Sequence, residues 1–324
     1  FYLLLGFAIF MYVWLDGFDL GLGILYPWFR DDQERDHMMR AVAPVWDGNE
    51  TWLVFGGVIL FAAFPTVYAV ALSTLYLPVM LMLIALVFRG VAFEYRFKAK
   101  TSRPWWDLAF AAGSTVAAFC QGLMLGAVVQ GVEGHAQGSS LNWLSPFAIF
   151  CGFALMAGYA LLACTFLVMK TRHALAARAA TLGQGLVWWV LGALVVVSLW
   201  SVWHSPAVWS RWFEGGRFLW LWPLPVLCAL VAWRLNRALR TGTSEYRPFA
   251  LAVALFALGF VGLLVSTFPY LVPGQIRYMD VAAPDISLRF VGVGVLMFLP
   301  VILAYTLWGY KVFHGKVEDM EAGY

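Results

Sequence analysis

The chain has 324 residues, of which 62% are hydrophobic and 12% charged, and its mean hydropathy is +0.78. Globular domains in water have roughly 45–50% apolar and 25% charged residues. This chain therefore has too little charge to cover a water-facing surface, which excludes a soluble enzyme, a disordered chain and a nucleic-acid-binding protein. Its net charge of +3 is too small to indicate an anionic partner. The composition predicts an all-α integral membrane protein surrounded by membrane lipids.

Nine segments are long and apolar enough to cross a bilayer, which takes about 20 mostly apolar residues. We expect membrane helices at residues 1–29, 48–68, 71–93, 106–129, 146–169, 186–203, 218–236, 248–271 and 289–311. Residues 51–88 carry no charge and must hold two helices, with the turn at either Pro65–Thr66 or Ser73–Thr74. The first span begins at Phe1 without a polar flank, so we expect a few residues to precede it.

The basic residues predict how these helices are oriented. Seventeen of the 21 Lys and Arg residues lie near the ends of the first, third, fifth, seventh and ninth helices. The alternate loops hold the other four, Arg211, Arg217, Arg277 and Arg289. Basic loops favour the cytoplasm, so we expect an outside N-terminus and a cytoplasmic C-terminus.

Two carboxyl groups, those of Asp16 and Asp19, interrupt the first apolar run. Counted from Arg30 at ~1.5 Å per residue, they lie about 21 and 16 Å inside the cytoplasmic boundary. Residues three apart share a helix face, so we expect the two groups to share a proton in this apolar medium. Ionisable groups at membrane depth are functional candidates. The alternative is a structural pair that binds a neighbouring helix.

A second polar cluster lies at the cytoplasmic mouth of the second helix, where Asp47, Asn49 and Glu50 stand between Trp46 and Trp52. Asp47 could cap the helix by accepting from its free backbone N–H groups, and acidic residues suit the first turn of a helix. Two carboxyl groups and an amide exceed what capping needs. The cluster therefore also predicts the beginning of a polar file that carries protons inward.

Arg89 and Glu94 lie at the end of the third helix, on the same side of the membrane. Their spacing of five residues is poor for a pair within one helix. We expect Arg89 to reach a carboxylate on another helix, or an anionic group of a cofactor or lipid. The alternative is that its side chain extends to the membrane surface.

The histidines argue against a redox centre held by this chain alone. All five fall in loops, in tails or at the edges of the expected helices: His37, His135, His173, His204 and His314. A haem within a helical bundle needs a His, Met or Cys ligand at membrane depth. The methionines and the four cysteines within the spans are typical packing residues, and metal-binding Cys spacings are absent from the sequence.

Three motifs in this order resemble subunit II of the cytochrome bd quinol oxidases. They are LDGFDLGLG at Leu15–Gly23, APVWDGNETWL at Ala43–Leu53 and FRGVAFEYR at Phe88–Arg96. The likeness extends to FAAFPTVY at Phe61–Tyr68 and to residues 121–130, and thus covers about the first 130 residues. The NET sequence at residues 49–51, together with Gly90, is more similar to the cyanide-insensitive branch of the family.

The resemblance implies a multi-pass protein of the bacterial inner membrane, in a complex that oxidises quinol and reduces dioxygen to water. Haem b and haem d would be ligated by subunit I, the partner in a heterodimer. The implied architecture is a single transmembrane domain with one four-helix bundle in residues 1–129, a second in 146–271, and a peripheral helix at 289–311. It leaves open a quinone bound in this chain and small single-helix accessory subunits.

The resemblance also implies roles for individual residues. Asp47 corresponds to a proton-uptake carboxylate on the cytoplasmic side, and Trp52 to a residue beside a hydrophobic oxygen channel. Asp16 and Asp19 match paired aspartates that face the subunit interface. Some family members have Gln where this chain has Glu50, which weakens an essential proton role for that residue.

Taken together, the site predicted from sequence has two parts. Asp47, Glu50, Asp16 and Asp19 form a proton pathway, while Arg89 and Glu94 are charge partners near the subunit interface. Two other classes compete with this reading: a proton-coupled secondary transporter and a purely structural partner subunit.

Overall fold

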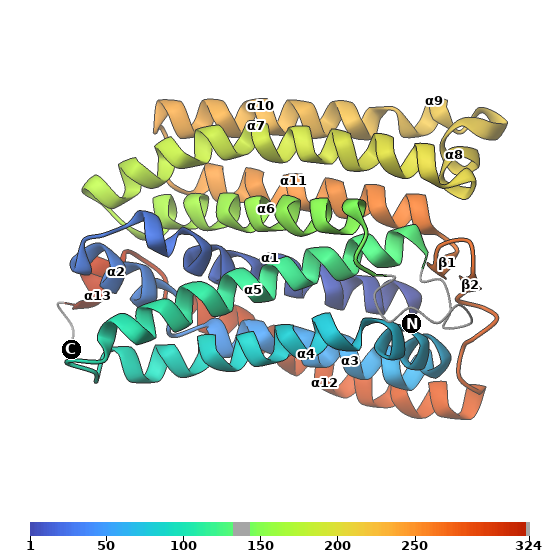
Figure 1. Ribbon diagram of the computed structural model, residues 1–324, viewed down its shortest axis with the longest axis horizontal. Helices are drawn as coiled ribbons and strands as arrows, with labels where there is room; N and C mark the ends of the chain where they lie inside the picture. The colour runs from blue at the N-terminus through green and yellow to red at the C-terminus, as the bar shows by residue number, and fades with distance from the viewer. Residues whose placement is uncertain (132–142, 322–324) are drawn as a thin grey trace.

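The computed structural model describes residues 1–131 and 143–321 of the chain. It is a bundle of long helices that lie side by side, with a small hairpin at one end (Figure 1). His135 falls outside the described residues. Helices dominate because a backbone surrounded by lipid must satisfy its hydrogen bonds within each segment.

The long helices are α1 (Tyr2–Leu25), α3 (Trp46–Ala63), α4 (Pro65–Arg96), α5 (Arg103–Gln130), α6 (Pro146–Lys170), α7 (His173–His204), α10 (Pro223–Thr241), α11 (Tyr246–Thr267) and α12 (Asp285–Val312). The short elements are η1 (Tyr26–Trp28), α2 (Asp32–Val42), α8 (Pro206–Phe213), η3 (Glu214–Gly216), α9 (Phe218–Leu221), α13 (Val317–Glu321), and the antiparallel strands β1 (Tyr270–Val272) and β2 (Ile276–Arg277).

The helices pack as successive pairs across the bundle (Figure 1). In the view of Figure 1, α7 and α10 lie at the top, followed by α6 and α11, then α1 and α5, then α3 and α4, with α12 at the bottom. The short helices α2 and α13 lie at one end of the bundle, and the β1–β2 hairpin lies at the other. The first end holds the connections expected in the cytoplasm.

Eight helices in the described residues are long and apolar enough to span a membrane. The helix that does not meet this criterion is α3, whose 18 residues include Asp47, Asn49 and Glu50 in the first turns. The expectation of an all-helical membrane protein is confirmed, whereas the count of nine spans stays a prediction.

Several predicted bounds were wrong. The break between the second and third spans lies at Phe64, so Pro65 opens α4 and the predicted start at residue 71 is too late. α4 continues through a kink at Leu75, three residues before Pro78, because a proline removes a backbone N–H and clashes with the preceding turn. α7 begins at His173, thirteen residues before the predicted span, because its polar first turns still form a helix beyond the apolar run.

Glycines set the closest helix contacts. The Gly17–Gly21 pair on α1 lies against Tyr159 of α6, where a Cβ at Gly17 would come within 2.7 Å of the tyrosine ring. The Gly122–Gly126 pair of α5 lies equally close to α6 on another side. Small residues four apart let helices approach in lipid, where the hydrophobic effect does not drive association. This packing places the carboxyl groups of α1 inside the bundle.

Candidate functional site

The two aspartates of α1 are buried inside this chain. Asp16 and Asp19 are both 0% exposed, on the part of α1 that contacts α3, α5 and α6. Their side chains therefore do not reach the surface of this chain, and their place near the subunit interface stays a prediction. Charges at membrane depth need partners, and α3 and α4 supply them.

Arg89 of α4 binds carboxylates from two other helices. Its Nη1 donates to Oδ1 of Asp16 at 2.6 Å, and its Nη2 lies 3.1 Å from Oε1 of Glu50 as an ion pair without hydrogen-bond geometry. The Arg89 side chain is fully buried, so it does not extend to the surface. We call Asp16, Asp19, Glu50 and Arg89 the inner carboxylate cluster.

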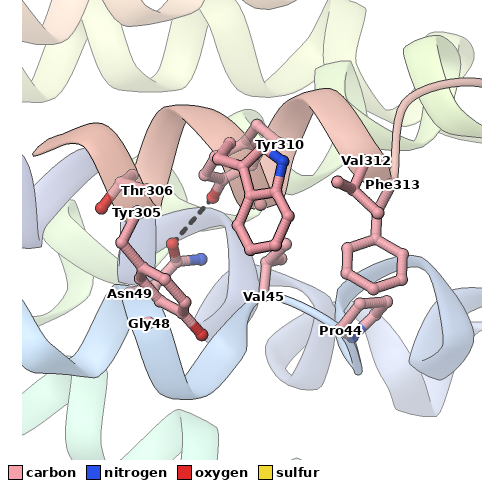
Figure 2. Close-up of a pocket in the computed structure, with 11 residues that line it drawn as sticks. Pro44, Val45, Gly48, Asn49, Tyr305, Thr306, Tyr310, Val312 and Phe313 are labelled. Atoms are coloured by element: carbon pink, nitrogen blue, oxygen red, sulfur yellow. Dashed lines mark hydrogen bonds between the residues drawn. The ribbon is translucent and has the colours of Figure 1, made fainter. Parts of the chain in front are cut away.

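Asn49 connects Asp19 to the last long helix. Its Nδ2 donates to Oδ2 of Asp19 at 2.7 Å and to the carbonyl oxygen of Leu15 at 3.3 Å. Its Oδ1 accepts from the Tyr310 hydroxyl of α12 at 2.8 Å (Figure 2). Sequence reasoning noted Asn49 only as part of the second cluster and missed Tyr310, because nothing in a 28-residue apolar helix indicates which tyrosine points inward.

The acidic side chains become less exposed from the first turn of α3 to the interior part of α1. Asp47 is exposed and lies in the first turn of α3, but the N-cap position belongs to Val45, so the capping role is wrong. The Glu50 side chain is 24% exposed and that of Asp16 only 1%. Asp47 and Glu50 are three residues apart and share a helix face. The acidic groups thus lead from water into the protein.

Aromatic rings enclose the polar groups. Trp46 stacks on Phe93 with centroids 5.1 Å apart, and the Arg89 guanidinium lies 5.9 Å from the Trp46 ring. Trp52 is 0% exposed and packs edge-on against Phe7 of α1. In the described part of the chain, its indole Nε1 has no hydrogen-bond partner. The aromatic shell keeps the surroundings of the inner carboxylate cluster apolar.

Glu94 does not join this cluster. Its carboxylate lies 3.7 Å from Lys98, which follows the end of α4, in an exposed ion pair. Five residues separate Arg89 from Glu94, so the two side chains leave α4 in different directions. Exposed pairs of this kind contribute little to stability.

A second ionic cluster lies nearer the end of the bundle and was not predicted. Arg96 of α4 donates to Asp107 of α5 and to Asp36 of α2, while Arg103 also donates to Asp36. Arg35 lies 3.2 Å from Asp107. We call these five residues the outer arginine cluster. Asp107 could have indicated this cluster. It lies within the predicted 106–129 span, and ionisable residues within membrane spans are functional candidates.

The outer arginine cluster stabilises the ionised form of its acids. Partial burial acts to raise the pKa of Asp36, but hydrogen bonds and charge from Arg96 and Arg103 outweigh it and lower that pKa below its usual range. The Tyr26 hydroxyl donates to Oδ1 of Asp107 at 2.8 Å. This arrangement joins α2, α4 and α5 and is suited to holding them together.

A third polar group joins three helices and includes Tyr12, which lies one turn before Asp16 in α1. Gln121 of α5 donates through Nε2 to the Tyr12 hydroxyl at 2.6 Å and accepts from the Tyr159 hydroxyl at 2.7 Å. Tyr159 is the residue against which Gly17 and Gly21 pack. Sequence reasoning noted Gln121 within a similar segment but gave it no role, because its partners lie on two distant helices.

The inner carboxylate cluster has more acid than base. Three carboxyl groups share one guanidinium, and Oδ2 of Asp16 and Oδ1 of Asp19 have no hydrogen-bond partner among the described residues. Such a cluster can hold an exchangeable proton within the bundle, because two like charges in an apolar medium repel each other.

Comparison with known proteins identifies the family. The profile of the cytochrome bd terminal oxidase subunit II family matches residues 1–313. The chain belongs to this family. It is 31% identical to the probable cytochrome oxidase subunit 2 of Haemophilus influenzae, with 98% of this chain and 92% of the relative covered.

Other relatives of the cytochrome bd family agree over their whole length. The cytochrome bd-I ubiquinol oxidase subunit 2 of Escherichia coli K12 is 28% identical, with 98% of this chain and 94% of the relative covered. The Bacillus subtilis cytochrome bd ubiquinol oxidase subunit 2 is 27% identical, with 96% and 94% covered. The solved bd oxidase of Geobacillus thermodenitrificans has the same fold, with a TM-score of 0.75, 19% identity and coverage of 95% and 96%.

Cytochrome bd oxidases are haem-dependent, and the positions of the described histidines bear on whether this chain ligates a haem. His37 lies in α2, His173 at the first residue of α7, and His314 after the end of α12. His204 is the last residue of α7. These positions lie in a short helix or at or just beyond the ends of long ones, not at the depth that axial ligation within the bundle needs. The described part of the chain also holds no group of three or more His, Cys, Asp or Glu residues arranged for a metal. The described residues of this chain therefore do not fit a haem site.

Proposed function

We propose that this subunit pairs with the haem-bearing subunit I and supplies part of the path by which protons from the cytoplasm reach the site of oxygen reduction. The observation that carries the proposal is the inward sequence of acids, from exposed Asp47 through half-buried Glu50 to buried Asp16. Ionisable groups in series at membrane depth are typical of proton relays.

The overall reaction explains why such a path is needed. Quinol oxidation on the outer side releases protons there, while reduction of dioxygen to water consumes protons drawn from the cytoplasm. Charge is then separated across the membrane without pumping, provided that protons have an inward route. Asp47, Glu50, Asp16 and Asp19 form that route in the proposal.

The proposal includes the orientation and the helical bundles. The described basic loops α4–α5, α6–α7 and α10–α11 lie at the end of the molecule that also holds α2 and α13, which supports placing this end in the cytoplasm (Figure 1). α3 would be the ninth span. α1, α3, α4 and α5 would form one bundle, and α6, α7, α10 and α11 the other, with α12 outside both.

Oxygen access is a separate part of the proposal. Trp52 is buried among aromatic rings of α1 and α3, and its place in the matching motif supports a position beside an apolar path for dioxygen. In the proposal the haem groups are held by subunit I, and a quinone bound in this subunit and small accessory subunits remain part of the assembled oxidase.

A purely structural role is the competing function, and one observation favours it. Asp16 is paired with Arg89 at 2.6 Å inside the protein, and removal of one member of a buried pair commonly destabilises a fold. Asp47 distinguishes the two functions. It is exposed, and its carboxylate makes no salt bridge or hydrogen bond with a described residue, so a structural role does not require it.

The test is the Asp47→Asn substitution in the complete oxidase, with Asp32→Asn as the matched control. Both are exposed acids in the first turn of a helix at the same end of the chain. Quinol-driven oxygen consumption and proton uptake in vesicles are measured after haem content is shown to be normal. We expect Asp47→Asn to slow both by at least about tenfold and Asp32→Asn to leave them unchanged. Normal turnover in Asp47→Asn would overturn the proton assignment.

A further inference from the structure

We infer that Tyr310 of α12 is a positioning residue for Asp19, acting through the amide of Asn49. The inference rests on the proposed function, since it gives Asp19 a role in proton uptake. It concerns a residue outside the motifs of the first three long helices, on a helix that otherwise contributes little to the interior.

The hydrogen bonds around Asn49 have one consistent orientation. The NH₂ group of an asparagine only donates and its carbonyl oxygen only accepts. Nδ2 donates to Asp19 and to the Leu15 carbonyl oxygen, which leaves Oδ1 for the Tyr310 hydroxyl at 2.8 Å. If the amide turned over, Oδ1 would face two acceptors. Tyr310 provides the donor that holds Oδ1 on the far side.

Burial makes this orientation important. Asn49 is 1% exposed and Asp19 is 0% exposed, so water does not readily replace a lost partner. One oxygen of Asp19 already lacks a hydrogen-bond partner among the described residues. The bond from Asn49 is thus the hydrogen bond that fixes the other oxygen, and its direction depends on the Tyr310 hydroxyl.

The amide also limits what this chain of contacts can do. An asparagine side chain does not readily pass a proton along, because it has no titratable group near neutral pH. The contact from Tyr310 therefore orients Asp19 rather than conducting protons to it. The other charged groups around Asp19 are Asp16 on its own helix, Glu50 on α3 and Arg89 on α4, and none of them contacts the Asn49 oxygen in a recorded hydrogen bond.

The surroundings of Tyr310 show that its hydroxyl is not required for packing. No residue of α12 is fully buried. A cavity of about 260 Å³ between the start of α3 and the end of α12 has Asn49 and Tyr310 in its wall (Figure 2). A phenylalanine at position 310 keeps the ring in place, so the substitution removes the hydrogen bond and little else.

Tyr305 provides the matched control. It lies on the same helix and lines the same cavity, but its ring points toward Gly48 rather than Asn49 (Figure 2). Its hydroxyl makes no hydrogen bond with the described residues, so Tyr305→Phe removes the same atom from the same region without touching the Asn49 amide.

The experiment uses infrared difference spectra of the whole oxidase, reduced minus oxidised and acid minus neutral, with Asp19→Asn to identify the Asp19 carboxyl and carboxylate bands. We expect Tyr310→Phe to shift these bands and to lower turnover about fivefold, at normal haem content. Tyr305→Phe should change neither. On an Asn49→Ala background, Tyr310→Phe should add nothing further, because the two residues act in one chain of contacts.

The outcomes separate this inference from the proposed function. Unshifted Asp19 bands in Tyr310→Phe, or an equal effect on the Asn49→Ala background, would overturn the positioning role. If Asp19→Asn retains full turnover while Tyr310→Phe still shifts the Asp19 bands, the positioning role stands and Asp19 has no part in proton uptake. If Tyr310→Phe lowers assembly, the Asn49→Ala variant is compared with the Asn49→Ala/Tyr310→Phe double variant at equal haem content.

Discussion

The inner carboxylate cluster and the outer arginine cluster are built from the same residue types but have opposite balances of charge. The inner one has three carboxyl groups and one guanidinium, with carboxyl oxygens that lack described hydrogen-bond partners. The outer one has three guanidiniums and two carboxylates, and both acids accept from more than one donor. An excess of acid can exchange protons, whereas an excess of base keeps acids ionised and locks three helices together.

The difference teaches that burial of charge alone does not identify a functional group. Arg89 and Arg96 are both 0% exposed. Each pairs with two acids. What distinguishes them is the ratio of acids to guanidiniums in their clusters and whether those acids continue a series that begins in water. The predictions below test this distinction, beginning with the largest expected effect.

Arg89→Gln should have the largest effect. It leaves Asp16 buried without its positive partner, and breaking a buried ion pair costs about 3–5 kcal/mol. We expect most of the assembled oxidase to be lost, as measured by haem content per membrane protein. Arg89→Lys, which keeps the charge, should retain more. Full assembly of Arg89→Gln would mean that the inner cluster does not depend on this pair.

Gly21→Leu should come next. Any side chain at Gly21 meets the backbone of Tyr159 in α6, and overpacking costs about 1–3 kcal/mol or more. It would move α1, and with it the inner carboxylate cluster, away from α6. Gly57→Leu is the control, because a Cβ there meets nothing within 4 Å. Thermal stability and turnover per haem should fall in the first variant only.

The pair Asp19→Asn and Asp107→Asn tests the comparison directly. Asp19→Asn should lower turnover per haem by about tenfold or more at nearly normal melting temperature, since an amide preserves the shape. Asp107→Asn weakens the outer cluster and should lower the melting temperature by about 3 °C with unchanged turnover per haem. The reverse pattern would show that the charge balance does not separate proton transfer from structure.

The smallest effect is expected at acid pH. Because the pKa of Asp36 is lowered in the folded protein, its carboxylate stabilises the fold above the unfolded value of about 3.9. This contribution is lost as the pH falls through the lower, folded value. Asp36→Asn should therefore lower stability at pH 6, and this difference should shrink as the pH falls below the unfolded value and through the folded one. Melting curves of the purified complex across this range check it, and a constant difference at all pH values would contradict it.

The site was partly predictable because burying charge is costly, so charged residues within apolar segments are few and easily recognised. Asp16, Asp19 and Arg89 interrupt apolar runs. They are functional candidates because charged groups are costly in a lipid environment. Glu94 pairs with Lys98, four residues further along the chain, and its role as a charge partner near the subunit interface stays a prediction. Asp107 and Tyr310 were missed because partners of theirs lie far away in the sequence. Asp107 pairs with Arg35, 72 residues away, and Tyr310 with Asn49, 261 residues away.

The sequence by itself determined the solvent, the helical class, most of the spans and the family-like motifs, because hydropathy and local charge are read directly from residue order. The tertiary structure decided which charges meet. Arg89 reaches Asp16 because the Gly17–Gly21 face brings α1 against α6, Gly113 brings α5 against α4, and α5 also packs against α1. Electrostatic energy in an apolar interior depends on distances of a few ångströms, and distances between helices are set by packing rather than by sequence separation.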